Sequence, residues 1–341
     1  MIWKKERVGL AFLLALGWII AAALPTEALA QGPSKDPDSV IVAGGPTAGL
    51  FNIVAAATAE VLRKEFPKSI IDVVPGGSGP NLIQAEQRKI TIGLTYANNS
   101  YDAWHGRDPA KPDRPIRNVR GTIALFPSAI QIWVPADSPV KSFKDLVGKK
   151  ICPSSPGQAP WQTYHNLLEV YGITTKDIEK AGGKIVQLTW QEAVKSLANG
   201  QIDSVLWLTL FPHSAMVEVE VGRPLRLLSL EPDKSQAFLE KYGGGFTPIT
   251  IPAGTYKGQK EPARTLSTVG FYVTPAGTPD DLIYRIVKAI WNNLDPLRRS
   301  HVSLNYATKE TVGRGMALPL HPGAERFFRE NQIPFDPPTL K

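Results

Sequence analysis

Cysteine is almost absent from this sequence. The single cysteine, Cys152, cannot form a disulfide within the chain, so a hydrophobic core has to supply the stability. With 341 residues, the chain is long enough for a large core and for two domains or lobes.

The sequence also lacks any block of five or more lysines and arginines, although its formal net charge is +7. Its aromatic residues do not alternate with basic ones. The pattern therefore gives no support for a nucleic-acid partner. A basic exported protein is instead suited to anionic ligands or membrane surfaces.

Motifs for metals, nucleotides and cofactors are missing as well. No two of the five histidines are separated by the three to five residues that would place two ligands on one helix face. The glycine-rich stretch 44–49 has neither the Gly-x-Gly-x-x-Gly spacing nor the lysine of a phosphate-binding loop. We therefore expect no cofactor and no metal.

The N-terminus has the pattern of a secretory signal peptide. Three bases within residues 1–7 precede an apolar run over 8–24, and Ala-Leu-Ala follows at 28–30. This order predicts cleavage before Gln31 and a periplasmic protein. An uncleaved membrane anchor is the alternative, but the run is short for a bilayer, and no later segment is apolar for long enough to cross one.

Three loops of small residues each follow a β-branched run and precede a helical pattern. We name them the first loop (44–49), the second loop (76–81) and the third loop (154–158). This order leaves backbone N–H groups of the first helical turn unpaired, and such groups attract anions. Each loop taken alone could be an ordinary turn. The three together favour one shared anion-binding pocket.

Strand and helix patterns alternate along the chain, which predicts an α/β fold with parallel strands. Helical periods cover 159–171 and 232–242, and two separate strands are expected over 119–125 and 129–134. The rhythm restarts after 135 and returns near 266. We expect one lobe from 31–134 and 266–341, and a second lobe from 135–265.

Several segments together resemble the TAXI family, the extracytoplasmic solute receptors of TRAP-type transporters. The similarity extends from about Val40 to Ile333 and includes all three loops. The most specific segments are Thr250-Ile251-Pro252-Ala253-Gly254-Thr255-Tyr256-Lys257-Gly258-Gln259 and His321-Pro322-Gly323-Ala324-Glu325-Arg326-Phe327-Phe328.

The resemblance implies a type II periplasmic-binding-protein fold, with two α/β lobes joined by a hinge and the ligand cleft between them. It implies a monomer that is not an enzyme, a small organic anion (a carboxylate or an amino acid) as ligand, and a TRAP-type membrane permease as partner. The ligand-binding residues that it implies are Gly45, Thr47, Ala48, Gly49, Ser78, Asn81, Ser155, Gly157 and Gln158.

Four further candidates come from places where this chain departs from the family pattern or presents a wall. Tyr96 and Asn98 stand where relatives often have a glutamine and an acid, which favours a ligand without an ammonium group. Trp161 and Trp207 could cover an apolar part of the ligand, although tryptophans at such positions also pack in cores.

Three other functions stay open at this point. The receptor could report to a signalling partner instead of a permease. A secreted hydrolase could use Ser78 as its nucleophile, although Pro80 stands where a nucleophile elbow has its last glycine. The chain could also be a surface antigen with a vestigial pocket.

Overall fold

The computed structural model describes residues 35–47, 49–107 and 114–336. The expected signal peptide and Ala48 lie outside these residues. Ten strands form one mixed sheet in the order β2-β1-β3-β10-β4-β7-β5-β6, with β8 paired to β4 and β9 to β10. The strands are β1 (Ser39–Ala43), β2 (Ile70–Val74), β3 (Ile92–Tyr96), β4 (Val119–Pro135), β5 (Lys150–Cys152), β6 (Lys184–Ile185), β7 (Ser204–Thr209), β8 (Leu225–Leu227), β9 (Thr247–Ile251) and β10 (Ala263–Pro275).

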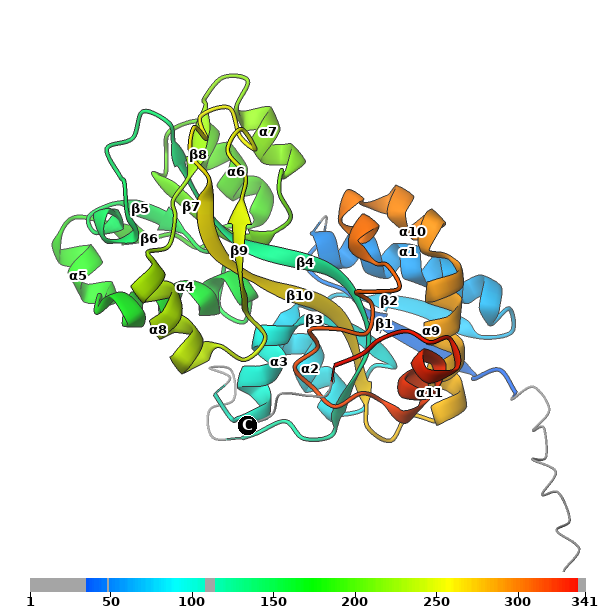
Figure 1. Cartoon of the computed structure of the whole chain (residues 1–341). Helices are drawn as coiled ribbons and strands as arrows, with labels where there is room; N and C mark the ends of the chain where they lie inside the picture. The colour runs from blue at the N-terminus through cyan, green and yellow to red at the C-terminus, as the bar shows by residue number, and fades with distance from the viewer. Residues whose placement is uncertain (1–34, 48, 108–113, 337–341) are drawn as a thin grey trace, which may run out of the picture. The chain divides into compact units, whose positions relative to one another are not determined.

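Helices connect the strands and cover the sheet (Figure 1). They are α1 (Leu50–Glu65), α2 (Ser78–Glu86), α3 (Ala97–Trp104), α4 (Ala159–Tyr171), α5 (Thr175–Lys180), α6 (Trp190–Ala198), α7 (Ser214–Val219), α8 (Pro232–Tyr242), α9 (Asp280–Asn292), α10 (Leu294–Ser300) and α11 (Pro322–Glu330), with 3-10 turns η1 (Phe143–Leu146) and η2 (Val302–Tyr306). No described helix combines the length and the apolar character needed to cross a membrane.

Each half of the sheet has its own set of parallel strands. In the first half β1 pairs in parallel with β2 and β3, and in the second half β5 pairs in parallel with β6 and β7. The connections that leave the carboxyl ends of such strands emerge at one edge. The first and second loops and the start of α3 share one such edge, and the third loop and the starts of α6 and α7 share the other.

Two long strands, β4 and β10, join these halves through the centre of the sheet (Figure 1). The sequence predicted two strands with a break at 126–128, and this was wrong, because β4 is continuous over Val119–Pro135. Pro127 pairs with Val269 beside a register shift in β10. The ring of Phe126 lies over Gly270, where an added Cβ would fall 2.2 Å from it. Burial of this ring holds the strand together where proline removes a donor.

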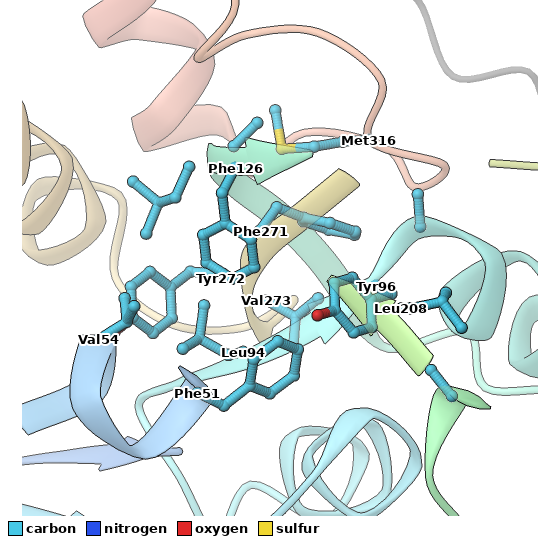
Figure 2. Close-up of a cluster of buried hydrophobic side chains, with 14 of the residues drawn as sticks. Phe51, Val54, Leu94, Tyr96, Phe126, Leu208, Phe271, Tyr272, Val273 and Met316 are labelled. Atoms are coloured by element: carbon cyan, nitrogen blue, oxygen red, sulfur yellow. The ribbon is translucent and has the colours of Figure 1, made fainter. Parts of the chain in front are cut away.

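The main hydrophobic core extends across both halves. Figure 2 shows Tyr96 of β3 beside Leu208 of β7, and Phe51 and Phe126 belong to the same cluster. A second, smaller cluster contains Trp133, with Trp190 and Trp207 packed against it. Because side chains alternate along a strand, the neighbours Trp207 and Leu208 face opposite sides of the sheet and enter different clusters.

Candidate functional site

Asn81 joins the first loop to the second. Its side chain is fully buried, and its Nδ2 donates to the carbonyls of Gly44 at 2.7 Å and Leu94 at 2.8 Å. Its Oδ1 accepts from the N–H of Gly77 at 3.3 Å. The amide of this predicted ligand-binding residue is thus engaged by the backbone, and it fixes the two loops against β3.

Gln158 joins the third loop to the second. Its side-chain amide lies over Gly77, where an added Cβ would be 2.7 Å from Nε2 and 2.8 Å from Oε1. Any larger side chain at position 77 would have to displace this amide. Residues from the two carboxyl edges therefore meet at this point.

The helices that begin at these loops have no side-chain caps. Gly49, Gly77 and Gln158 are the N-cap residues of α1, α2 and α4, and none provides a capping hydrogen bond. In contrast, threonines cap α5 and α6 with capping boxes. Helices α8, α9 and α10 also lack side-chain caps, so missing caps alone do not mark a site. The site is distinguished by the way its loops come together.

Two backbone N–H groups at the helix starts already have hydrogen-bond partners within the chain. The N–H of Gly49 donates to the carbonyl of Pro46 at 3.0 Å, and the N–H of Gln158 donates to Ser155 at 3.2 Å. Both groups close turns within their own loops. The donors left to an anion are the remaining first-turn N–H groups. They exclude Asn52, whose N–H donates to the carbonyl of Gly49 at 3.0 Å, and Pro80 and Pro160, which have no N–H.

The other loop residues differ in their accessibility. Thr47 is exposed, and Gly45 is buried against the ring of Phe51. Ser155 and Gly157 are half-buried. Gly157 has a φ of 82°, which favours glycine and lets the third loop turn into α4.

Tyr96 belongs to the core as much as to the site. Its ring centroid is 4.8 Å from that of Phe51, and Ser128 Oγ donates to its hydroxyl at 3.1 Å. Burial raises the pKa of Tyr96 to about 12, although the hydrogen bond from Ser128 acts in the opposite direction. The phenol is therefore protonated throughout the neutral range.

Asn98 is 1% exposed, and neither atom of its side-chain amide has a hydrogen-bond partner among the described residues. The buried Oδ1 of the neighbouring Asn99 has none either. Both residues lie in the first turn of α3. Buried polar atoms without partners are rare in native proteins, so these two side chains are unusual.

The tryptophans predicted as walls lie on different elements of the second half, α4 and β7. Trp161, in the first turn of α4, packs against His165 with ring centroids 4.5 Å apart. Trp207 packs against Trp190 at 5.0 Å in the second cluster. The described contacts do not bring Trp207 to the three loops, so its role as a wall stays a prediction.

Sequence reasoning missed Trp190 and His213, which lie at the same edge as the third loop. Trp190 is the first residue of α6, and its ring centroid is 4.5 Å from that of His213. The capping box of Thr189 and Glu192 marks where α6 begins, so it was the sequence signal that could have pointed to Trp190.

The site offers no catalytic apparatus around Ser78. This serine is 2% exposed, and within the described part of the chain no histidine or carboxylate is hydrogen-bonded to its hydroxyl. No group of three or more histidine, cysteine or acidic side chains in the described ranges could hold a metal ion. The arrangement is suited to binding by backbone and amide groups.

Known structures share this fold. MatC from Rhodopseudomonas palustris with bound malate is 14% identical, with a TM-score of 0.52 over 86% of this chain and 96% of that one. The Xanthomonas citri protein XAC2383 bound to chloride ion is 9% identical, with a TM-score of 0.51 over 86% and 96%. The periplasmic aliphatic sulphonate binding protein SsuA from Escherichia coli is 14% identical, with a TM-score of 0.47 over 89% and 96%.

The likenesses to MatC and XAC2383 and the sheet order define the fold class. The protein has a type II periplasmic-binding-protein fold, in which two α/β lobes are joined by a hinge. The model of the NMT1-like family matches residues 42–331, and the chain belongs to that family. The expected fold class is thereby confirmed.

Proposed function

We propose that this protein is a periplasmic solute receptor that captures a small organic anion and delivers it to a membrane permease. The observation that carries the proposal is the meeting of Gln158 with Gly77, which joins loops from the two carboxyl edges. A solute held by both loops would hold the lobes together, so binding and closure would be one event. No bond in the ligand is made or broken.

The chemistry of the site favours an anion with hydrogen-bond acceptors. First-turn N–H groups of α1, α2 and α4 point out of their helices, and each helix dipole contributes about 0.3–1 kcal/mol toward a negative charge. The fold is shared with a malate-bound protein and a chloride-bound one. A carboxylate ligand therefore suits both the backbone donors and the fold.

We further propose that the permease is of the TRAP type, as the TAXI resemblance implies. The segments 250–259 and 321–328 support this assignment. Membership of the NMT1-like family leaves the type of permease open. Uptake of the bound solute by cells that express each candidate permease with this receptor would decide between them.

Two alternatives have less support. The fold suits a receptor that signals to a partner, and loss of transport on deletion would argue against that role. Hydrolysis by Ser78 lacks a hydrogen-bonded base, as described above. Activity toward ester substrates that disappears in the Ser78→Ala variant would support a hydrolase.

Calorimetry and thermal shift with the exported protein would test the receptor. The panel contains aliphatic carboxylates, dicarboxylates, amino acids and aromatic acids. Binding to the native state must raise the melting temperature, because it stabilises that state by RT ln(1 + c/Kd) at a free ligand concentration c. A carboxylate that binds and raises the melting temperature supports the proposal. Failure of every organic anion, with native mass spectrometry showing an empty pocket, would contradict it.

A further inference from the structure

A cavity of about 540 Å³ lies beside β10, one of the two long strands at the centre of the sheet. None of the described residues that line it belongs to the first, second or third loop. Sites for small molecules have volumes of about 300–1,000 Å³. The cavity therefore has room for a ligand, and it is separate from the residues that the proposed receptor function uses.

Segments from distant parts of the sequence surround this cavity. They are Tyr101 of α3, residues 243–247, which lead from α8 into β9, Ser267 and Val269 of β10, residues 315–317, and Asp336. The glycine run 243–245 comes so close to α3 that a Cβ added to Gly244 would lie 1.9 Å from the ring of Tyr101. This run therefore closes one side of the cavity over α3.

The surface of the cavity is mostly apolar. Its apolar lining consists of Tyr101, Phe246, Val269, Met316 and Ala317. Thr247 and Ser267 add hydroxyl groups. Because the transfer of apolar surface out of water is favourable, a molecule with an apolar body is stabilised in this cavity.

One carboxylate lies at this apolar surface. Asp336 is exposed, and within the described part of the chain it is the one lining residue that carries a charge at neutral pH. Its Oδ2 accepts from the N–H of Gly315 at 3.3 Å, and its own N–H donates to the carbonyl of Gly313 at 3.4 Å. These two bonds hold the carboxylate beside the cavity. A ligand with a positive charge is therefore favoured over a neutral or a negative one.

Other charges near the cavity do not reverse this preference. The guanidinium of Arg107 lies 5.0 Å from the ring centroid of Tyr101, but it is paired with Asp102 at 3.0 Å. Arg314 is exposed and does not line the cavity. Asp336 thus sets the sign of the charge that fits.

We propose that this cavity is a second binding site and that its ligand is an organic cation, with an apolar body inside the cavity and an ammonium group against Asp336. The inference goes beyond the proposed function, which concerns an anion held by the loops. Residues 243–247 belong to the expected second lobe and the other lining residues to the first. The cation would therefore contact both lobes.

Three probes with nearly the same apolar body test the charge. They are 4-phenylbutylamine, 4-phenylbutanol and 4-phenylbutyrate, which are positive, neutral and negative at pH 7. We expect the amine to bind in the cavity about threefold to fivefold more tightly than the alcohol, since an ion pair at an exposed carboxylate is weak. The acid should bind there more weakly than the alcohol.

The methionines report where each probe binds. Met316 lines the cavity, whereas Met216 is fully buried in the second cluster. In protein labelled with carbon-13 in its methionine methyl groups, a bound phenyl ring should shift the Met316 signal in a saturable way and leave the Met216 signal in place. The Met316→Leu variant assigns the two signals. Binding of the acid at the loops is thereby distinguished from binding in the cavity.

Two pairs of variants test the residues. Asp336→Asn should remove the advantage of the amine over the alcohol, whereas Asp72→Asn should keep it, because Asp72 is exposed on β2 and does not line the cavity. Thr247→Trp should weaken the binding of all three probes at least fivefold by filling the cavity. Thr250→Trp is its control, because Thr250 is exposed on the same strand but outside the cavity. Melting curves confirm that each variant is folded.

The result expected is a saturable shift of the Met316 signal, with a preference for the amine that depends on Asp336. A Met316 signal that none of the probes moves at millimolar concentration would show that the cavity is not a ligand site. Equal affinities of the amine and the alcohol, or an advantage that survives in Asp336→Asn, would rule out the cation. The receptor function is tested separately, by the carboxylate panel.

Discussion

The side-chain amide of Gln158 occupies the space above Gly77, and the two residues belong to loops at opposite carboxyl edges of the sheet. A methyl group on Gly77 would displace the end of a flexible side chain instead of backbone. Such a change should alter the site more than the fold.

The first prediction concerns this pair. Gly77→Ala should lower ligand affinity about tenfold and change the melting temperature by less than about 4 °C, because only the Gln158 amide has to move. Calorimetry of both single variants and the double variant measures the coupling. In a Gln158→Ala background the alanine at 77 should have no further effect on affinity, and independent effects at the two sites would contradict the contact.

The second prediction concerns Asn81, whose amide holds the first two loops. Asn81→Asp replaces its donors with oxygens that face the carbonyls of Gly44 and Leu94. We expect a loss of about 2–4 kcal/mol in the free energy of unfolding in urea. Asn305→Asp, at an exposed position whose side chain makes no hydrogen bond among the described residues, should stay within about 0.5 kcal/mol of the wild type. Equal effects of the two changes would mean that Asn81 does not fix the loops.

The third prediction concerns the segment over α3. Gly244→Ala places a methyl group inside the ring of Tyr101, so the free energy of unfolding should fall by about 1–3 kcal/mol. Tyr101→Ala should suppress most of that loss by making room. Gly222→Ala is the control, because nothing lies within 4 Å of its added Cβ. A loss at 244 that persists without the tyrosine ring would disprove the steric cause.

The fourth prediction concerns acid stability. Burial, with a further contribution from His301, lowers the pKa of His213 to about 4. The unfolded state therefore binds this proton near pH 6.5 and the folded state does not, so stability falls as the pH drops from 6.5 toward 4. Between pH 8 and pH 5, the titration of His213 should lower the free energy of unfolding by about 2 kcal/mol.

His213→Asn tests this sign, since asparagine can still cap α7. Melting curves from pH 8 to pH 5 should show a shallower decline for the variant than for the wild type. The histidines at 301 and 321, whose pKa values are also lowered by burial, titrate in both proteins and cancel in the comparison. Parallel declines would show that His213 is not the group responsible.

Local patterns in the sequence were sufficient for some elements. Helices α4 and α8 occupy the predicted residues 159–171 and 232–242, because each combines an amphipathic period with a proline at its start. Helix α3 was not predicted, since Ala-Asn-Asn-Ser has no apolar period, and its formation depends on packing against β3 and β10. The continuity of β4 was missed because it depends on a partner strand far along the chain.

The same distinction applies to the site. The loops could be found because strand, small residues and helix follow one another locally. The contact between Gln158 and Gly77 could not, because it depends on how two separate parts of the sheet come together. The partners of Asn81 and the lack of partners at Asn98 likewise depend on burial, which the sequence of a short turn does not encode. The ligand roles of the thirteen predicted residues stay predictions.

The position of β10 between β3 and β4 also sets an order of assembly. Residues 119–227 contain β4 to β8, so the second half of the sheet has its strands soon after they are synthesised. The first half waits, because β3 keeps an open edge until Ala263–Pro275 arrives. An unpaired edge strand can pair with the wrong strand or with another chain. The edge of β3 is exposed to such pairing while well over a hundred further residues are synthesised. A chain exported before β10 is complete would cross the membrane with this half still unfolded.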